Sequence, residues 1–192
     1  MKRVFIIHGW EGYPEEGWFP WLKKELEKKG FKVEIPTMPE ASHPKINTWV
    51  SHLKKIIGAA DEETFFVGYS IGCQAVLRYL ETVKNKKIGG VVLVAGWVHL
   101  TTAALETDED RKIAKPWLET PIDWNGINKH RFAAIFSDND PYVPLSDSKI
   151  FKSRLGAKII IEKNKKHFSG SDGITELKSA LDELLAISSQ LS

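Results

Sequence analysis

The sequence predicts an α/β fold in which a parallel sheet of about six strands carries helices on both faces. Three observations favour this fold. Short runs of consecutive apolar β-formers, at residues 4–7, 65–67 and 88–95, are typical of strands that are buried on both faces. Segments with the periodicity of amphipathic helices lie between these runs. The two kinds of segment alternate about six times, which indicates βαβ units with right-handed crossovers.

Length and composition limit the classes of protein that fit. The 192 residues suffice for one domain with a full core, so we expect a single domain over residues 1–192. A net charge of +2 gives no broad attraction for nucleic acid. The single cysteine excludes an internal disulfide, and the apolar run at residues 4–7 is too short for a signal peptide or a membrane span. We therefore expect a cytoplasmic protein, a monomer or weak homodimer, without nucleic-acid or membrane partners.

Helix signals follow the first strand. Trp18, Leu22 and Leu26 recur at the spacing of an amphipathic helix, and Gly30 is a typical residue for its end. Asn47 belongs to the residue types that cap helices. In order, the first part of the chain is expected to hold a strand at residues 4–7, a helix from 18 to 30, a strand at 32–35 and a helix from 47 to 57.

The second part of the chain repeats this alternation, with one interruption. From residue 98 to about 128 the pattern degrades into prolines and acidic residues, which indicates a short helical cap insertion rather than core. Elsewhere the sequence predicts strands at residues 65–67, 88–95, 132–136 and 157–161, and helices at 73–80, 146–155 and 173–187.

The central motif occupies residues 64–75, T-F-F-V-G-Y-S-I-G-C-Q-A. It reads as a strand, a very tight turn and a helix, with Ser70 at the apex between Gly68 and Gly72. Such a turn holds the Ser70 hydroxyl at the carboxyl edge of the sheet and places the N–H of Ile71 beside it. This is what acyl transfer needs, because one local fold supplies a nucleophile and half of an oxyanion hole.

A serine hydroxyl is a poor nucleophile until a base accepts its proton, and histidine suits that role near neutral pH. Of the six histidines, His167 follows the last predicted strand and so lies at the correct edge of the sheet. We expect His167 to be the base. His8 ends the first strand, and we interpret it as a structural residue that supports the adjacent turn. The lysines beside His167 are interpreted as a solvated basic loop rather than as an attractor for anionic substrates.

The imidazole needs an acid to hold its tautomer and to stabilise its charged form. The loop after the fifth strand offers Asp138 and Asp140. We favour Asp140, because Pro141 holds it extended, but Asp138 stays open as the alternative. The chain order Ser70, Asp140, His167 is that of the α/β-hydrolase arrangement.

The remaining site residues are expected around this centre. The second oxyanion donor should be the N–H of Trp10, in the loop after the first strand. Trp18, Trp97 and Trp117 are candidates to line an apolar acyl pocket, although each can equally be core or cap packing. The chemistry requires no metal and no organic cofactor.

The chain resembles the small serine hydrolases of the retinoblastoma-binding serine hydrolase family, a compact branch of the α/β-hydrolase superfamily. The resemblance covers nearly the whole chain and implies Ser70 as nucleophile, Asp140 as acid and His167 as base, within a six-stranded sheet with a small cap. It also implies a weak carboxylesterase or related acyl hydrolase. No L-x-C-x-E stretch is present, so the sequence gives no support for binding to the retinoblastoma protein. The motifs that carry the resemblance are H-G at 8–9, G-W-F-P-W-L-K-K at 17–24, M-P at 38–39, G-Y-S-I-G-C at 68–73, S-D-N-D-P-Y-V-P at 137–144 and H-F at 167–168.

These observations predict a serine hydrolase that cleaves a small or medium acyl ester through an acyl-enzyme, with a thioester or amide as other possible bonds. The partner would be a small-molecule acyl substrate. The alternative is a weak or inactive protein of the same fold that acts as a ligand- or protein-binding module. A flavodoxin-like nucleotide binder is disfavoured, because the loop after the first strand lacks a G-x-G-x-x-G or Walker pattern.

Overall fold

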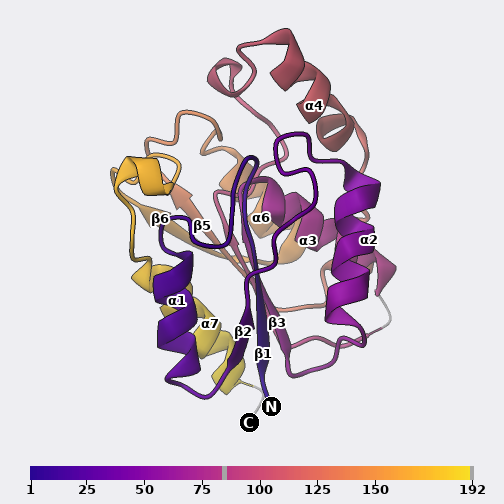
Figure 1. Ribbon diagram of the computed structural model, residues 1–192, viewed down its shortest axis with the longest axis vertical. Helices are drawn as coiled ribbons and strands as arrows, with labels where there is room; N and C mark the ends of the chain where they lie inside the picture. The colour runs from indigo at the N-terminus through magenta and orange to yellow at the C-terminus, as the bar shows by residue number, and fades with distance from the viewer. Residues whose placement is uncertain (84–85, 191–192) are drawn as a thin grey trace.

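Six parallel strands form one sheet in the order β2-β1-β3-β4-β5-β6 in the computed structural model, which describes residues 1–83 and 86–190. The predicted six-stranded parallel sheet is confirmed. The chain starts at β1, adds β2 beside it as one edge of the sheet, and then crosses over to build β3 to β6 on the other side of β1 (Figure 1). The direction of winding therefore changes between β1 and β3, and such a switch point opens a crevice at the carboxyl ends of the strands. The strands are β1 (Arg3–Ile7), β2 (Lys32–Glu34), β3 (Thr64–Tyr69), β4 (Gly90–Val94), β5 (Phe132–Ser137) and β6 (Lys158–Glu162).

Helices cover both faces of the sheet, as Figure 1 shows. Helices α1 and α7 pack against one face, while α2, α3 and α6 pack against the other. The apolar runs alternate between these two cores: Val4 and Ile6 belong to the first, Phe5 and Ile7 to the second. This explains why the strands lack a polar face. The helices are α1 (Phe19–Glu27), α2 (Ile46–Ile57), α3 (Ile71–Thr82), α4 (Asp108–Glu119), α5 (Trp124–Ile127), α6 (Asp147–Leu155) and α7 (Lys178–Ser189), with short 3₁₀ turns η1 (Thr102–Ala104) and η2 (Gly170–Asp172).

Two predicted helix starts are wrong. Asn47 does not cap α2, which begins one residue earlier, after an extended Lys45 and without a side-chain cap. The last helix begins at Lys178 rather than at residue 173. Ser169 closes a capping box around η2, and Gly173 ends that turn in the left-handed conformation, so the chain runs on without helix before α7 starts.

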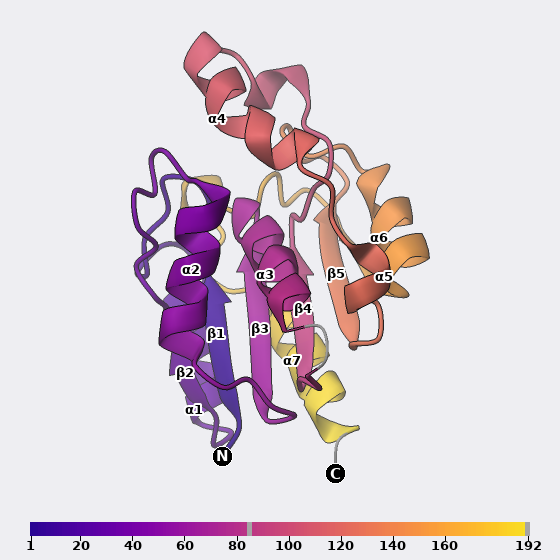
Figure 2. The ribbon, with the colours of Figure 1, turned by 90° about the vertical axis from the view of Figure 1, so that its right-hand side faces the viewer.

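The segment between β4 and β5 carries η1, α4 and α5. Figure 2 shows α4 standing beyond the carboxyl ends of the strands. The buried Trp117 anchors α4, because its Nε1–H donates to the carbonyl of Pro44 at 2.9 Å and its ring meets Trp49 edge-on. The guanidinium of Arg78, on α3, donates to the carbonyls of Trp117 and Thr120 at 3.0 and 2.8 Å. Buried contacts thus fix this segment above the sheet.

None of the helices in the described ranges combines the length and the apolar character that a membrane span requires.

Candidate active site

Ser70 lies between β3 and α3 in a strained conformation, with φ 53° and ψ −123°. Its N–H donates to the carbonyl of Val94 at 2.9 Å, which ties the turn to the neighbouring strand β4. Glycine is required at Gly72, because a Cβ there would lie 2.3 Å from the carbonyl oxygen of Ile7. The tight strand–turn–helix predicted from the motif is confirmed, and it presents the Ser70 side chain at the carboxyl edge of the sheet.

The structure brings Ser70, His167 and Asp140 together, although they lie far apart in the sequence. The Nε2 atom of His167 is 2.9 Å from the Oγ of Ser70, and its Nδ1 is 2.8 Å from an oxygen of Asp140. The His167 and Asp140 side chains are only 12% and 3% exposed. The carboxylate fixes the tautomer: Nδ1–H donates to Asp140, which leaves Nε2 free to accept the Ser70 proton. This arrangement can move a proton from the hydroxyl to the imidazole.

Two main-chain N–H groups belong to residues that line the same cavity as Ser70. Ile71 opens α3, where an N–H has no acceptor within its own helix. Trp10 follows β1, and Gly9 lets that loop approach so closely that a Cβ there would lie 3.1 Å from the ring of Tyr69. Neither the Trp10 nor the Ile71 N–H has a protein acceptor among the described residues, and both residues line the same cavity. These N–H groups can therefore donate hydrogen bonds to a bound carbonyl oxygen on which negative charge develops.

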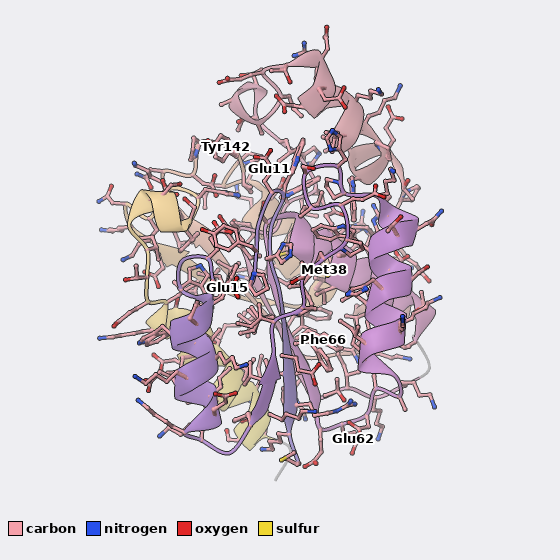
Figure 3. All side chains as sticks on the ribbon, in the orientation of Figure 1. Glu11, Glu15, Met38, Glu62, Phe66 and Tyr142 are labelled. Atoms are coloured by element: carbon pink, nitrogen blue, oxygen red, sulfur yellow. The ribbon has the colours of Figure 1, made fainter. Side chains whose placement is uncertain are left out.

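A cavity of about 630 Å³ opens over Ser70 and His167. The loop after β1, the segment that carries η1 and α4, and the loops after β5 and β6 form its walls. Figure 3 shows Glu11 and Tyr142, both of which line this cavity, between the sheet and α4. Within the described ranges, no group of three or more His, Cys, Asp and Glu side chains is placed to hold a metal ion.

Comparison with known proteins identifies the family. The model of the serine hydrolase family matches residues 4–186. The chain belongs to the serine hydrolase family. The protein YdeN of Bacillus subtilis (strain 168) is 33% identical over 187 residues, which cover 95% of this chain and 94% of that protein. The serine hydrolase RBBP9 of Rattus norvegicus is 26% identical over 159 residues, with 81% and 80% covered. The resemblance noted from the motifs is thereby confirmed.

Solved structures show the same fold. The crystal structure of the B. subtilis ydeN gene product has a TM-score of 0.89 and 30% identity, and the match covers 98% of this chain and all of that one. A carboxylesterase structure from Nitrososphaera gargenis has a TM-score of 0.72 at 14% identity, covering 100% and 92% of the two chains, which shows a likeness of fold alone. The compact α/β-hydrolase fold of this serine hydrolase is confirmed.

Four consecutive residues, the last of β5 and the first three of the loop after it, hold His167 and the loop that carries it. Asp140 contacts the imidazole and also accepts the N–H groups of Tyr142 and Val143 at 2.9 and 3.0 Å. Asp138 does not reach the imidazole; its carboxylate accepts the N–H of Asn164 at 2.8 Å. The side chains of Ser137 and Asn139 accept the N–H groups of Lys165 and Lys166, respectively. Asp138 therefore braces the loop, and Asp140 is the carboxylate in contact with the histidine.

Two tyrosines that the sequence analysis did not assign also fix the imidazole of this serine hydrolase. The ring of Tyr69 lies 5.4 Å from the His167 ring, and its hydroxyl donates to the His167 carbonyl at 2.8 Å. Burial raises the pKa of Tyr69 well above its usual value, so the hydroxyl stays a donor. Tyr142 meets the imidazole edge-on at 5.1 Å. Both tyrosines stand beside predicted site residues in the sequence, and that adjacency was the available signal.

The prediction that tryptophans line the pocket is right for some of them and wrong for others. Trp97 and Trp10 line the cavity. The prediction was wrong for Trp18 and Trp117, which are 1% exposed and do not belong to the cavity wall. Trp117 anchors α4, and the Nε1–H of Trp18 donates to the carbonyl of Phe168 at 3.0 Å, directly after the histidine. Both rings are used for packing because each has a main-chain acceptor at the point where it is buried.

His8 is fully buried and holds the loop after β1. Its Nε2 accepts the N–H of Met38 at 3.0 Å, so Nδ1 carries the proton and donates to the carbonyl of Gly9 at 2.9 Å. Burial lowers the pKa of His8, which keeps the ring neutral. The structural role predicted for His8 is confirmed, because these two bonds set the backbone next to Trp10.

Proposed function

We propose that this serine hydrolase cleaves small or medium acyl esters through a Ser70–His167–Asp140 catalytic triad and an acyl-enzyme. The supporting observation is the continuous hydrogen-bonded line from the Ser70 hydroxyl through the His167 ring to the Asp140 carboxylate, at 2.9 and 2.8 Å. Family membership supports hydrolysis as the reaction class. The bond cleaved is proposed to be an ester because an alcohol leaves more readily than an amine, with a thioester or an amide as other possible bonds.

In the first half of the reaction, the Ser70 Oγ attacks the substrate carbonyl while Nε2 of His167 takes the hydroxyl proton. The charge that forms on the imidazole is stabilised by Asp140. The carbonyl oxygen becomes negative and accepts hydrogen bonds from the N–H groups of Trp10 and Ile71. When the tetrahedral intermediate collapses, the bond to the leaving alcohol breaks and His167 returns the proton to that oxygen.

In the second half, water replaces the alcohol. His167 removes a proton from water as the new oxygen attacks the acyl carbonyl, and the same two N–H groups stabilise the second oxyanion. Collapse breaks the bond between the acyl carbon and Ser70 Oγ, which recovers its proton from His167. The acid leaves, and the chain returns to its starting state.

The decisive experiment combines covalent labelling with turnover. A fluorophosphonate probe should label the wild-type protein stoichiometrically, and Ser70→Ala should lose both the label and the hydrolysis of p-nitrophenyl esters of graded acyl length. Ser51→Ala removes an exposed hydroxyl on α2 and should behave as wild type. Aminoacyl arylamides run beside the esters compare the two bond types. Absence of labelling across a range of pH would overturn the proposal in favour of a binding module.

A further inference from the structure

The cavity wall is rich in carboxylates. Among the described residues that line it, none is a lysine or an arginine, although the whole chain carries 27 of them and a net charge of +2. The acidic wall is therefore not a reflection of composition. Lys163 and Lys165, which stand close to His167 in the sequence, do not belong to the wall. The carboxylates that line the cavity are Glu11, Glu16, Glu106, Glu109, Asp110 and Asp172.

Several of these carboxylates already have partners in the protein. Asp110 closes the capping box at the start of α4. Asp172 accepts the N–H of His167 and lies 3.7 Å from the ammonium of Lys166. Glu109 lies 3.7 Å from the imidazole of His43. The charges of these carboxylates still contribute to the electrostatic potential in the cavity, but the hydrogen bonds and ion pairs just described account for their positions.

Glu16 differs, because it is partly buried and forms no ion pair with any residue in the described part of the chain. Its carboxylate lies over the loop after β1: a Cβ on Gly12 would be 3.1 Å from a Glu16 oxygen and 3.0 Å from Nδ1 of His8. On its other side is Gly170, whose added Cβ would lie 3.8 Å from Cγ of Glu16. The side chain thus sits between the loop that carries Trp10 and the loop that carries His167.

The electrostatics of Glu16 agree with this position. Burial raises its pKa, and the N–H of Gly170 and the charge on His167 lower it by less. The Glu16 carboxylate has lost part of its hydration, and no lysine or arginine among the described residues pairs with it. A positively charged ligand group would supply the missing partner.

We infer that Glu16 is a specificity-determining residue that binds a cationic group of the substrate, and that the cavity selects ammonium-bearing acyl compounds over neutral or anionic ones. The inference rests on the proposed function, since it names the substrate class of the same site. The acidic wall attracts a cation and repels carboxylates and phosphates. Trp10 and Tyr142 add aromatic surface, on which a quaternary ammonium group packs well.

The test uses substrates that differ only in charge. One is butyrylthiocholine, compared with its neutral isostere in which a carbon replaces the quaternary nitrogen. The second pair consists of two p-nitrophenyl esters whose acyl chains end either in a quaternary ammonium group or in its neutral carbon isostere. The first pair thus tests a cation on the leaving group, and the second a cation on the acyl group. At least one pair should show kcat/KM about tenfold higher for the cation, and added salt should reduce the preference.

Glu16→Gln keeps the shape of the side chain and removes its charge. In this variant the roughly tenfold preference in kcat/KM for the cationic substrate over its neutral isostere should disappear, chiefly through a higher KM for the cation. Glu15→Gln is the matched control, because Glu15 is the preceding residue, is exposed and lies outside the cavity wall. Equal kcat/KM within both pairs for the wild-type protein, or a preference that survives Glu16→Gln, would overturn the inference.

A binding measurement separates this inference from the proposed function. Ser70→Ala cannot form an acyl-enzyme, so the intact pairs can be titrated against it by NMR. Tighter binding of the cationic member, lost on adding Glu16→Gln, supports the inference even if the wild-type protein hydrolyses nothing. Ser70-dependent hydrolysis of neutral esters together with equal binding of both members refutes the inference and leaves the hydrolase proposal intact.

Discussion

The carboxylate of Asp138 accepts the main-chain N–H of Asn164 at 2.8 Å, two residues before Asp140 meets the imidazole of His167. The two aspartates therefore act on the same loop in different ways. Asp138 holds the backbone where the loop leaves β6, and Asp140 holds the ring that faces Ser70. Substitution of the two residues should separate these contributions.

Asp140→Asn should lower kcat by about a thousandfold or more, because the amide no longer favours the reactive tautomer or stabilises the charged imidazole. Asp138→Asn keeps an oxygen for the Asn164 N–H and should cost less than about tenfold. Steady-state hydrolysis of p-nitrophenyl butyrate measures both. The assignment of the acid is wrong if Asp138→Asn proves the more damaging of the two.

Gly72→Ala should prevent correct folding of the turn that carries Ser70. Its Cβ would lie 2.3 Å from the carbonyl of Ile7 and 2.6 Å from that of His8, and neither backbone can move without displacing β1. We expect a loss of more than about 3 kcal/mol in the free energy of unfolding, measured by urea titration. Gly30→Ala is the comparison: Gly30 follows α1 at positive φ, and no atom lies within 4 Å of an added Cβ, so only about 1 kcal/mol of backbone strain is expected. Similar losses in both variants would contradict the steric explanation.

Arg78→Met should loosen the segment above the sheet. The Arg78 side chain is 3% exposed and donates to three carbonyls, those of Trp117, Thr120 and Pro121, which methionine cannot satisfy. The free energy of unfolding should fall by about 2–3 kcal/mol. Hydrogen exchange followed by mass spectrometry should show faster exchange across α4, with the sheet protected as before. Arg154→Met, at an exposed position on α6, is the matched control and should change neither quantity.

Acid should destabilise the fold through buried histidines before the carboxylates titrate. Burial lowers the pKa of His130 to about 4, and its Nε2 has no hydrogen-bond partner among the described residues. Burial also lowers the pKa of His8. A lowered folded pKa means that the unfolded chain binds the proton first, so the stability is present above about pH 6.5 and is lost as pH falls toward 4.

His130→Gln should therefore flatten the decline in stability over this window, by about 2 kcal/mol between pH 7 and pH 4. Urea unfolding at a series of pH values measures it. His43→Gln provides the reference, because that imidazole is more than half exposed. A slope unchanged by His130→Gln would show that the ring does not stay neutral in the folded chain.

The central turn was predictable because its causes are local. Gly68, Ser70 and Gly72 define the geometry by themselves, and the strand before them and the helix after them are visible in the sequence. The positions of Asp140 and His167 followed from a rule of topology, since residues after parallel strands meet at one edge of the sheet. In the structure both side chains lie at that edge, with His167 between Asp140 and Ser70.

The misses have a common cause in tertiary contacts. Trp18, Trp97 and Trp117 are alike in the sequence, and only the packing of α1 and α4 decides that one of them lines the cavity and the others fill the core. Nothing in the sequence indicates the position of Glu16, because that position depends on contact with Gly170, which lies more than a hundred residues away. The start of α7 shifted because a capping box formed upstream of it.

Residues from the first half of the chain seat the histidine that comes near its end. The hydroxyl of Tyr69 binds the carbonyl of His167, and the indole of Trp18 binds the carbonyl of the next residue. As the chain leaves the ribosome, Ser70 therefore emerges well before the histidine that these contacts seat. Reactivity toward a fluorophosphonate should consequently appear only when the last quarter of the chain has docked. The rate at which labelling appears would then report the final step of folding.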